Sequence, residues 1–165
     1  MATEHQEDIK KVAALMKGIR FVMLTTVHPD GSLHSRPMTT QDIDFDGDLW
    51  FFTSAHAHKV DEVNRDHQVN VSFAHTDKQT YISAAGVATL VRDRKKIEDL
   101  WKPAYKTFFH QGLDDPELAL LKVSVHTVEY WDSPSSAAGR LYSFVKAYAT
   151  GDVSALGDHD TVKVD

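Results

Sequence analysis

The chain has 165 residues and no cysteine, which excludes disulfides, iron–sulfur ligation and thiol catalysis by the protein itself. A chain of this length is most simply one domain, able to bury roughly 70% of its unfolded surface, and its net charge of −6, without a Lys/Arg cluster, argues against a nucleic-acid partner. No apolar run approaches the ~18 residues of a membrane span and the N-terminus is acidic, so we expect a cytoplasmic protein without a membrane partner, whose redox chemistry, if any, comes from a cofactor.

The first half of the chain is predicted to form a helix followed by strands. Apolar residues recur at helical spacing and stop at a glycine: Ile9, Val12, Ala13, Met16 and Gly18. Four strands should follow, at 21–28, 32–39, 41–45 and 49–53. Pro29-Asp30-Gly31 separates the first two, and Asp46-Gly47, the strongest short hairpin signal, separates the last two. Four strands joined by tight turns predict an antiparallel meander.

The second half alternates long strands with short helices. Strands are predicted at 69–73, 80–91 and 118–131, and helices at 56–66, after Asp93, and up to Gly151. Gly86, in the middle of a long strand, indicates a bend or bulge of the kind that barrel corners require. The residues from 105 to 116 should be irregular, and those from 152 to 165 have little to bury and should form a flexible tail. Such strands, with helices at their edges, favour a closed or nearly closed barrel.

The stretch 35–60 carries the groups of an anion site. Arg36 offers a planar fork of donors that matches a phosphate, and Lys59 adds a point charge. Thr53 and Ser54 supply hydroxyls, and a helix that begins just after them would point unpaired N–H groups at the same place. The aromatic run at 50–52 suggests that the anion belongs to a flat, apolar molecule. The alternative is that both cations are solvated surface charges and the aromatics are core.

This pattern resembles the flavin-binding split barrels related to pyridoxamine 5′-phosphate oxidase, most closely their bacterial general stress protein branch. In the oxidases, an R-x-x-x-x-K strand, an aromatic-Thr pair, and an R-K pair five and six residues after that Thr hold FMN. Gln41 stands here where the oxidases have a substrate-contacting lysine, and His58 where they have a basic flavin contact. The resemblance implies the following cofactor-binding residues in this part of the chain: Arg36, Pro37, Met38, Thr39, Gln41, Phe52, Thr53, His58 and Lys59.

Two later aromatics complete the implied site. Tyr81 precedes Gly86 by five residues, the spacing of a glutamine that contacts the flavin from the partner chain in the oxidases; the alternative is a cross-strand packing tyrosine. Glu129-Tyr130-Trp131 resembles the Glu-Phe-Trp of the oxidases, whose tryptophan touches FMN. In the oxidases a substrate-binding arginine follows six residues later, then Leu-His. Here that position is Ala137, and Arg140-Leu141-Tyr142 comes three residues on, so the flavin half of the motif is kept and the substrate half is not.

Ten histidines raise the question of a metal site. The nearest pair is His56-x-His58, but residues two apart do not share a face on a helix, and no third ligand has a recognisable spacing. We therefore expect no metal. Asp114-Asp115 is better explained as a solvated turn than as a carboxylate pair. No G-x-S-x-G, Walker loop or G-x-G-x-x-G is present, so hydrolase and dinucleotide-fold interpretations have no support.

The resemblance, which extends from about Lys10 to Gly151, implies a mainly β (α+β) fold: an antiparallel split β-barrel with peripheral helices, in which residues 1–151 form a single FMN-binding domain. It also implies a homodimer with the flavin, FMN or alternatively FAD, at the interface. The function indicated is an FMN-binding protein resembling general stress proteins, or a flavin-dependent oxidoreductase whose substrate and catalytic residues are unknown. The alternative is a non-catalytic flavin carrier or sensor in a stress response. A pyridoxamine 5′-phosphate oxidase is less favoured, because of Gln41 and the displaced Arg140.

Overall fold

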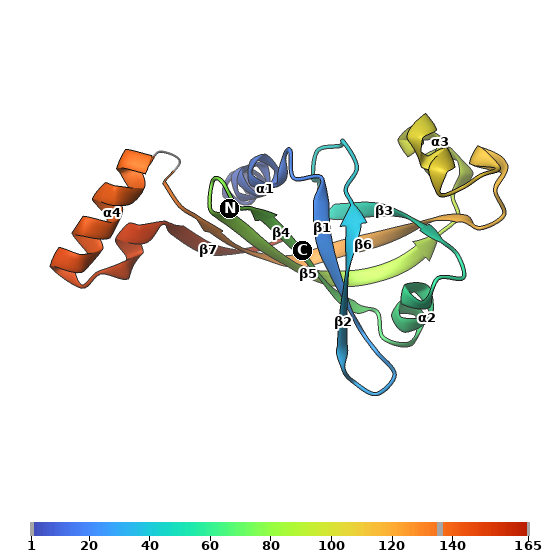
Figure 1. The fold of residues 1–165 in the computed structure, drawn as a ribbon, viewed down its shortest axis with the longest axis horizontal. Coiled ribbons are helices and arrows are strands. Elements are labelled where there is room, and N and C mark those ends of the chain that lie inside the picture. The colour runs from blue at the N-terminus through green and yellow to red at the C-terminus, as the bar shows by residue number, and fades with distance from the viewer. Residues whose placement is uncertain (1, 135–136, 165) are drawn as a thin grey trace.

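The computed structural model describes residues 2–134 and 137–164 and contains seven strands and four α-helices in these ranges (Figure 1). The strands are β1 (Phe21–Val27), β2 (Leu33–Thr39), β3 (Asp48–Ser54), β4 (Gln68–His75), β5 (Thr80–Val91), β6 (Leu118–Asp132) and β7 (Asp158–Lys163). The helices are α1 (Ala2–Met16), α2 (His58–Arg65), α3 (Arg94–Leu100) and α4 (Ala137–Thr150), with short 3₁₀ turns at Pro103–Thr107, Gly112–Asp114 and Val153–Leu156. In the described part of the chain, no helix is both long and apolar enough to span a bilayer.

All seven strands form one antiparallel sheet in the order β2-β1-β4-β5-β6-β3, with β7 paired to β6. The sheet curls, so that its two end strands, β2 and β3, come round toward each other (Figure 1). Within the described ranges no backbone ladder joins these two strands, which leaves the barrel split between them. The predicted fold, an antiparallel split barrel with helices at its periphery, is confirmed.

The predicted four-strand meander is wrong in its second half. Residues 41–45 form no strand, because Asp42 and Asp44 make the segment a poor strand former, and only Phe45 turns into the core. β3 instead pairs with β6, which lies far along the chain, with Phe51 opposite Leu121. Asp46-Gly47 is therefore a turn into β3 rather than the turn of a hairpin.

Alternation along the strands decides which side chains fill the barrel. Val69, Val71 and Phe73 on β4 are buried, while the residues between them are not. Helix α1 adds Val12 and Met16 to the same cluster. A second, smaller cluster lies outside this core, where the ring of Phe52 packs against Trp101 and Tyr105 with centroids 5.9 and 4.7 Å apart. Phe51 and Phe52, which are consecutive in β3, thus pack into two different apolar clusters.

The end of the chain is a strand, where we expected a loose tail. β6 is fifteen residues long; its first part, 118–124, pairs with β3, and its later part, 127–132, pairs with β7. The later part would otherwise present unpaired N–H and C=O groups at a sheet edge. β7 covers that edge and places Val162, only 5% exposed, opposite the buried Val128.

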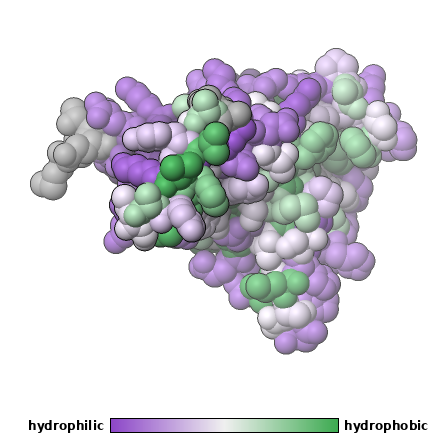
Figure 2. Space-filling model, turned by 60° about the vertical axis from the view of Figure 1, so that its left-hand side comes forward, coloured by the Kyte–Doolittle hydropathy of each residue, from purple (hydrophilic) through white to green (hydrophobic). Residues whose placement is uncertain are grey.

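Helix α4 lies away from the barrel, at one end of the molecule (Figure 1). The helix is present as predicted, but its large apolar side chains are exposed to solvent: Leu141, Tyr142, Phe144, Val145 and Tyr148. Figure 2 turns this end of the molecule forward and shows apolar surface on it. Large exposed apolar patches on proteins are often interaction surfaces, so this face of α4 is a candidate for one.

Gly86 provides a test of the barrel's curvature. The register between β5 and β6 shifts at Ala85/Gly86, which confirms the predicted bulge, and a Cβ at Gly86 would lie 2.3 Å from the Ser124 carbonyl oxygen. Gly86→Ala should therefore lower the free energy of unfolding by about 1–3 kcal/mol, measured by urea denaturation. Thr89→Ala, at an exposed position of the same strand, should cost less than about 1 kcal/mol. Equal losses in the two variants would contradict the close approach.

Candidate functional site

An open groove of about 710 Å³ lies between the β1–β2 hairpin and helix α2. It brings together three of the predicted site residues, Arg36, His58 and Lys59. The remaining lining comes from the same elements: His28, Pro29, His34, Ala57, Asp61, Glu62 and Arg65. Residues far apart in the sequence therefore meet here, as the anion-site hypothesis required.

Local packing explains why these side chains converge. Arg36 stands opposite Leu24, at the middle of the β1–β2 ladder. On α2, Val60 and Val63 are buried against the sheet, so the helix cannot rotate without exposing them. That orientation turns Glu62, only 6% exposed, toward β2.

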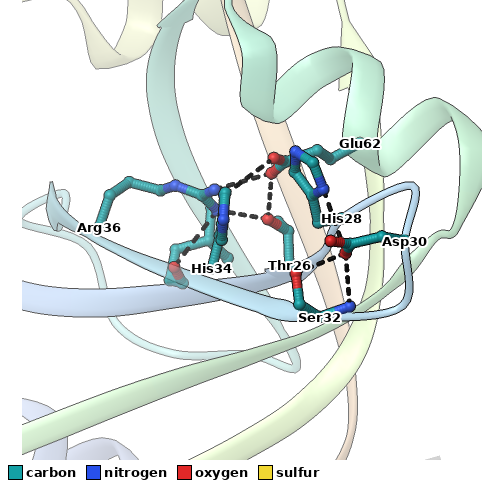
Figure 3. Close-up of polar contacts among 8 residues, drawn as sticks. Thr26, His28, Asp30, Ser32, His34, Arg36 and Glu62 are labelled. Atoms are coloured by element: carbon teal, nitrogen blue, oxygen red, sulfur yellow. Dashed lines mark hydrogen bonds and ion pairs between the residues drawn. The ribbon is translucent and has the colours of Figure 1, made fainter.

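Arg36 is held by a buried carboxylate (Figure 3). Its Nη2 donates to Glu62 Oε2 at 2.7 Å and its Nη1 donates to Thr26 Oγ1 at 2.5 Å, while the Thr26 hydroxyl donates to the same carboxylate oxygen. Burial alone would raise the pKa of Glu62, but the hydrogen bonds from Thr26 and Arg36, together with the charge of Arg36, hold it below its ordinary value. The carboxylate is therefore ionised at neutral pH, and it neutralises the arginine that was predicted to bind the anion.

Lys59 differs from Arg36, because no carboxylate of the described residues compensates its charge. Its side chain is half-buried in the groove wall, and among the described residues no acidic group lies within ion-pair distance of its ammonium. Burial, and then the positive charge of Arg36, lower the pKa of Lys59. An ammonium in this position gains most from an anion placed in the groove.

Sequence reasoning missed four residues of this groove network: Thr26, His28, His34 and Glu62. Only Glu62 left a usable signal. It lies three residues after Lys59 on a predicted helix, and residues at that spacing lie on neighbouring parts of the helix surface.

The two hydroxyls predicted for the anion site are engaged elsewhere. Thr53 is 3% exposed and its hydroxyl donates to the Ser54 carbonyl at 3.2 Å, while the Ser54 hydroxyl donates to Glu117 Oε2 at 2.7 Å. Neither residue lines the groove. Helix α2 begins at His58, two residues later than the predicted start at 56, because the residues before it complete a turn. His58 is exposed and Lys59 follows it into the groove wall.

The segment from Arg36 to Gln41 connects the groove to a second pocket. Along it Pro37 and Thr39 are exposed and Met38 is buried in the core. Gln41 lines a pocket of about 420 Å³ next to the end of α1. Its Oε1 accepts from the Tyr105 hydroxyl at 3.0 Å, but its Nε2 is buried without a hydrogen-bond partner among the described residues. A buried amide donor left unpaired costs stability, and a ligand oxygen would satisfy it.

Tyr81 and Trp131 lie opposite each other on β5 and β6, and both are exposed. Neither residue is among those that line the groove, and β1 and β4 separate β5 from β2 in the sheet. Trp131 stacks on His159 of β7 with centroids 5.0 Å apart and planes 7° from parallel.

Comparison with known proteins agrees with this architecture. Residues 7–154 match the family described as pyridoxamine 5′-phosphate oxidase like. A structure from Jannaschia sp. CCS1, named as a candidate general stress protein 26, superposes with a TM-score of 0.75 at 23% identity and covers 99% of both chains. The general stress FMN/FAD binding protein of Xanthomonas citri is 29% identical, with a TM-score of 0.68, over 79% of this chain and 92% of that one.

Among curated proteins, Neurospora crassa protein bli-3 is 26% identical over 155 residues, which span 88% of this chain and 74% of bli-3. The family match covers most of the chain, including every strand from β1 to β6 and the whole of the groove. The chain belongs to the pyridoxamine 5′-phosphate oxidase-like family.

Proposed function

We propose that this protein binds FMN, with the phosphate in the groove between β2 and α2. The observation that carries the proposal is Lys59, a half-buried cation that has no anionic partner among the described residues and is repelled by Arg36. A phosphate between them removes that repulsion. The guanidinium of Arg36 has five N–H donors, so it can hold Glu62 and a phosphate oxygen together. The Xanthomonas citri relative, described as an FMN/FAD binding protein, supports the same ligand class.

The described residues fit a long ligand with an anionic end. The segment from Arg36 to Gln41 has six residues, so its ends are five residues apart, and an extended chain of that length spans roughly 17 Å. Cations lie at one end, and the unpaired amide of Gln41 lies at the other. That amide would donate to a ring carbonyl or nitrogen, which a flavin has and a simple sugar phosphate lacks.

The chain's own residues bind and orient rather than transfer protons. Bound FMN would supply the hydride or electron chemistry. Glu62, the buried carboxylate of the groove, is held ionised by Arg36 and Thr26, so it is no proton donor at neutral pH. FMN binding is therefore the main proposal. Flavin-dependent oxidoreductase activity is a more specific proposal that goes beyond it, and a flavin carrier or sensor is the alternative. Anaerobic reduction by a nicotinamide cofactor, followed by a screen of electron acceptors, separates the two.

We also propose an oligomeric state for the protein, a homodimer. One chain presents exposed Tyr81 and Trp131 away from its own groove, and an apolar face on α4. In a two-fold homodimer each chain would cover the other's flavin, and α4 would bury its apolar face. Vitamin oxidase activity is not proposed, because Gln41 replaces a basic substrate contact and Arg140 lies on α4, outside the groove.

The direct experiment is to record the visible absorption spectrum of the purified protein and to identify any released ligand by mass spectrometry. A flavin spectrum with the mass of FMN supports the proposal. A colourless protein that also fails to bind added FMN overturns it.

Lys59→Ala should weaken FMN binding about 10- to 100-fold, because one charge-assisted contact to phosphate is lost. Fluorescence titration measures the dissociation constant. Lys10→Ala, at an exposed position of α1, is the matched control and should bind like wild type. Arg36→Ala is a poorer test, because an unpaired buried Glu62 costs about 3–5 kcal/mol of stability. Equal affinity in the two lysine variants would remove Lys59 from the site.

Glu62→Gln should strengthen FMN binding. The change keeps an acceptor for Arg36 and Thr26 but removes a negative charge from the phosphate's surroundings. A unit charge about 4 Å away is worth roughly 1 kcal/mol even in water, or about fivefold in affinity. Asp61→Asn, at an exposed position of the same groove, should have a smaller effect. Weaker binding by Glu62→Gln in a protein of unchanged stability would argue against a phosphate at this place.

FMN should also promote dimerisation, since a ligand that touches both chains stabilises the dimer by mass action. Sedimentation velocity on dilute, flavin-free protein should shift from monomer toward dimer when FMN is added. Trp131→Ala should reduce the shift, whereas Phe108→Ala, at an exposed aromatic that follows the 3₁₀ turn Pro103–Thr107, should not. A monomer that retains FMN, with Trp131→Ala behaving like wild type, would contradict the shared site.

A further inference from the structure

We propose that His28, His34 and Glu62 form a binding site for a divalent transition-metal ion such as Zn²⁺ at the mouth of the groove. One candidate ligand atom from each residue can be chosen so that all lie within 4.8 Å of one another. Figure 3 shows both rings and the carboxylate turned toward the same place. The proposal does not rest on flavin binding.

The β1–β2 hairpin brings the two histidines together. His28 directly follows β1 and His34 is on β2, and Gly31, with φ of +86°, makes the turn between them. The two rings lie 4.5 Å apart between centroids. Their separation of six residues matches no familiar metal motif, which is why the sequence predicted no metal and pointed instead to His56 and His58.

His28 has the supporting contact that metal-binding histidines usually have. Its Nδ1 lies 3.2 Å from Asp30 Oδ1. Asp30 is itself fixed by the Ser32 backbone N–H at 2.9 Å and the Ser32 hydroxyl at 2.5 Å, both of which donate to the same carboxylate oxygen. A carboxylate at Nδ1 favours the tautomer with its proton there and leaves the Nε2 lone pair for a metal ion.

The two carboxylate oxygens of Glu62 contact different residues. Oε2 accepts the hydrogen bonds from Arg36 and Thr26, whereas Oε1 lies 3.4 Å from His34 Nδ1. The first oxygen anchors the carboxylate, and the second faces the imidazoles. Metal-ligating carboxylates are commonly anchored by hydrogen bonds in this way.

Two nitrogens and one carboxylate oxygen suit Zn²⁺, which takes such ligands at about 2.0–2.2 Å and can keep a fourth position open. Ligand atoms would then lie roughly 3.3 Å apart, so the cluster must close by about 1.5 Å. His34, whose side chain is 52% exposed, has room to turn. Arg36 opposes the metal's charge and Glu62 offsets it, so we expect an affinity in the roughly micromolar range rather than that of a closed structural site.

The test is calorimetric titration of the full-length, chelator-treated protein with Zn²⁺ in phosphate-free buffer at neutral pH, with and without FMN. We expect one ion per chain in both conditions, and an affinity at least tenfold lower in His28→Ala and in His34→Ala. His56→Ala is the matched control, because His56 also contacts a glutamate, at 2.8 Å from Glu117 Oε1, but has no second histidine in its cluster. It should bind like wild type.

Co²⁺ provides a second readout, since its visible absorption bands report the coordination geometry. The wild-type protein should give the bands of a low-coordinate nitrogen–oxygen site, and His34→Ala should lose them while keeping the same thermal unfolding temperature. Absence of Zn²⁺ binding, equal affinity in wild type and His34→Ala, or loss only in His56→Ala would each overturn the proposal.

Discussion

The groove depends on one interaction, the ion pair between Arg36 on β2 and Glu62 on α2. It joins the free edge of the barrel to the helix beside it, and Thr26 completes the network with hydrogen bonds to both partners. Because the carboxylate is almost entirely buried, neither charge can be removed alone without leaving the other poorly compensated. Together with the buried Val60 and Val63, the pair therefore holds α2 against the sheet, and with it Lys59.

The charge balance of the groove follows from this pairing. Arg36 is already compensated, so in the proposed site the affinity for an anion would come mainly from Lys59 and from the donors of Arg36 that Glu62 does not use. Glu62 in turn opposes the anion. A site with an internal carboxylate binds phosphate less tightly than two bare cations would, but its geometry is fixed before the ligand arrives, which reduces the entropy lost on binding. The same carboxylate links Arg36, in the groove wall, to the neighbouring His34.

Patterns that act over a few residues were predicted well. Alternation and helical spacing placed β1, β2, β5, β6 and α2 close to their observed bounds, and the bulge at Gly86 followed from a glycine within a strand. Partners distant in the chain were not predictable: nothing local indicates that β6 pairs with β3 and then with β7. The predictions for the site show the same difference between local patterns and contacts between distant residues. The sequence predicted that Arg36 and Lys59 would lie close together, and both line the groove. It could not show that Thr53 turns away, that Glu62 contacts Arg36, or that a hairpin brings His28 and His34 together.

The central claim is that the groove recognises the phosphate of a flavin nucleotide. It is tested most directly by comparing the affinities of the wild-type protein for FMN and for riboflavin, which has the same ring and ribityl chain but no phosphate. If Lys59 and Arg36 hold the phosphate, FMN should bind at least about tenfold more tightly, and raising the salt concentration should reduce the difference. Equal affinity for the two flavins, at any salt concentration, would contradict the account.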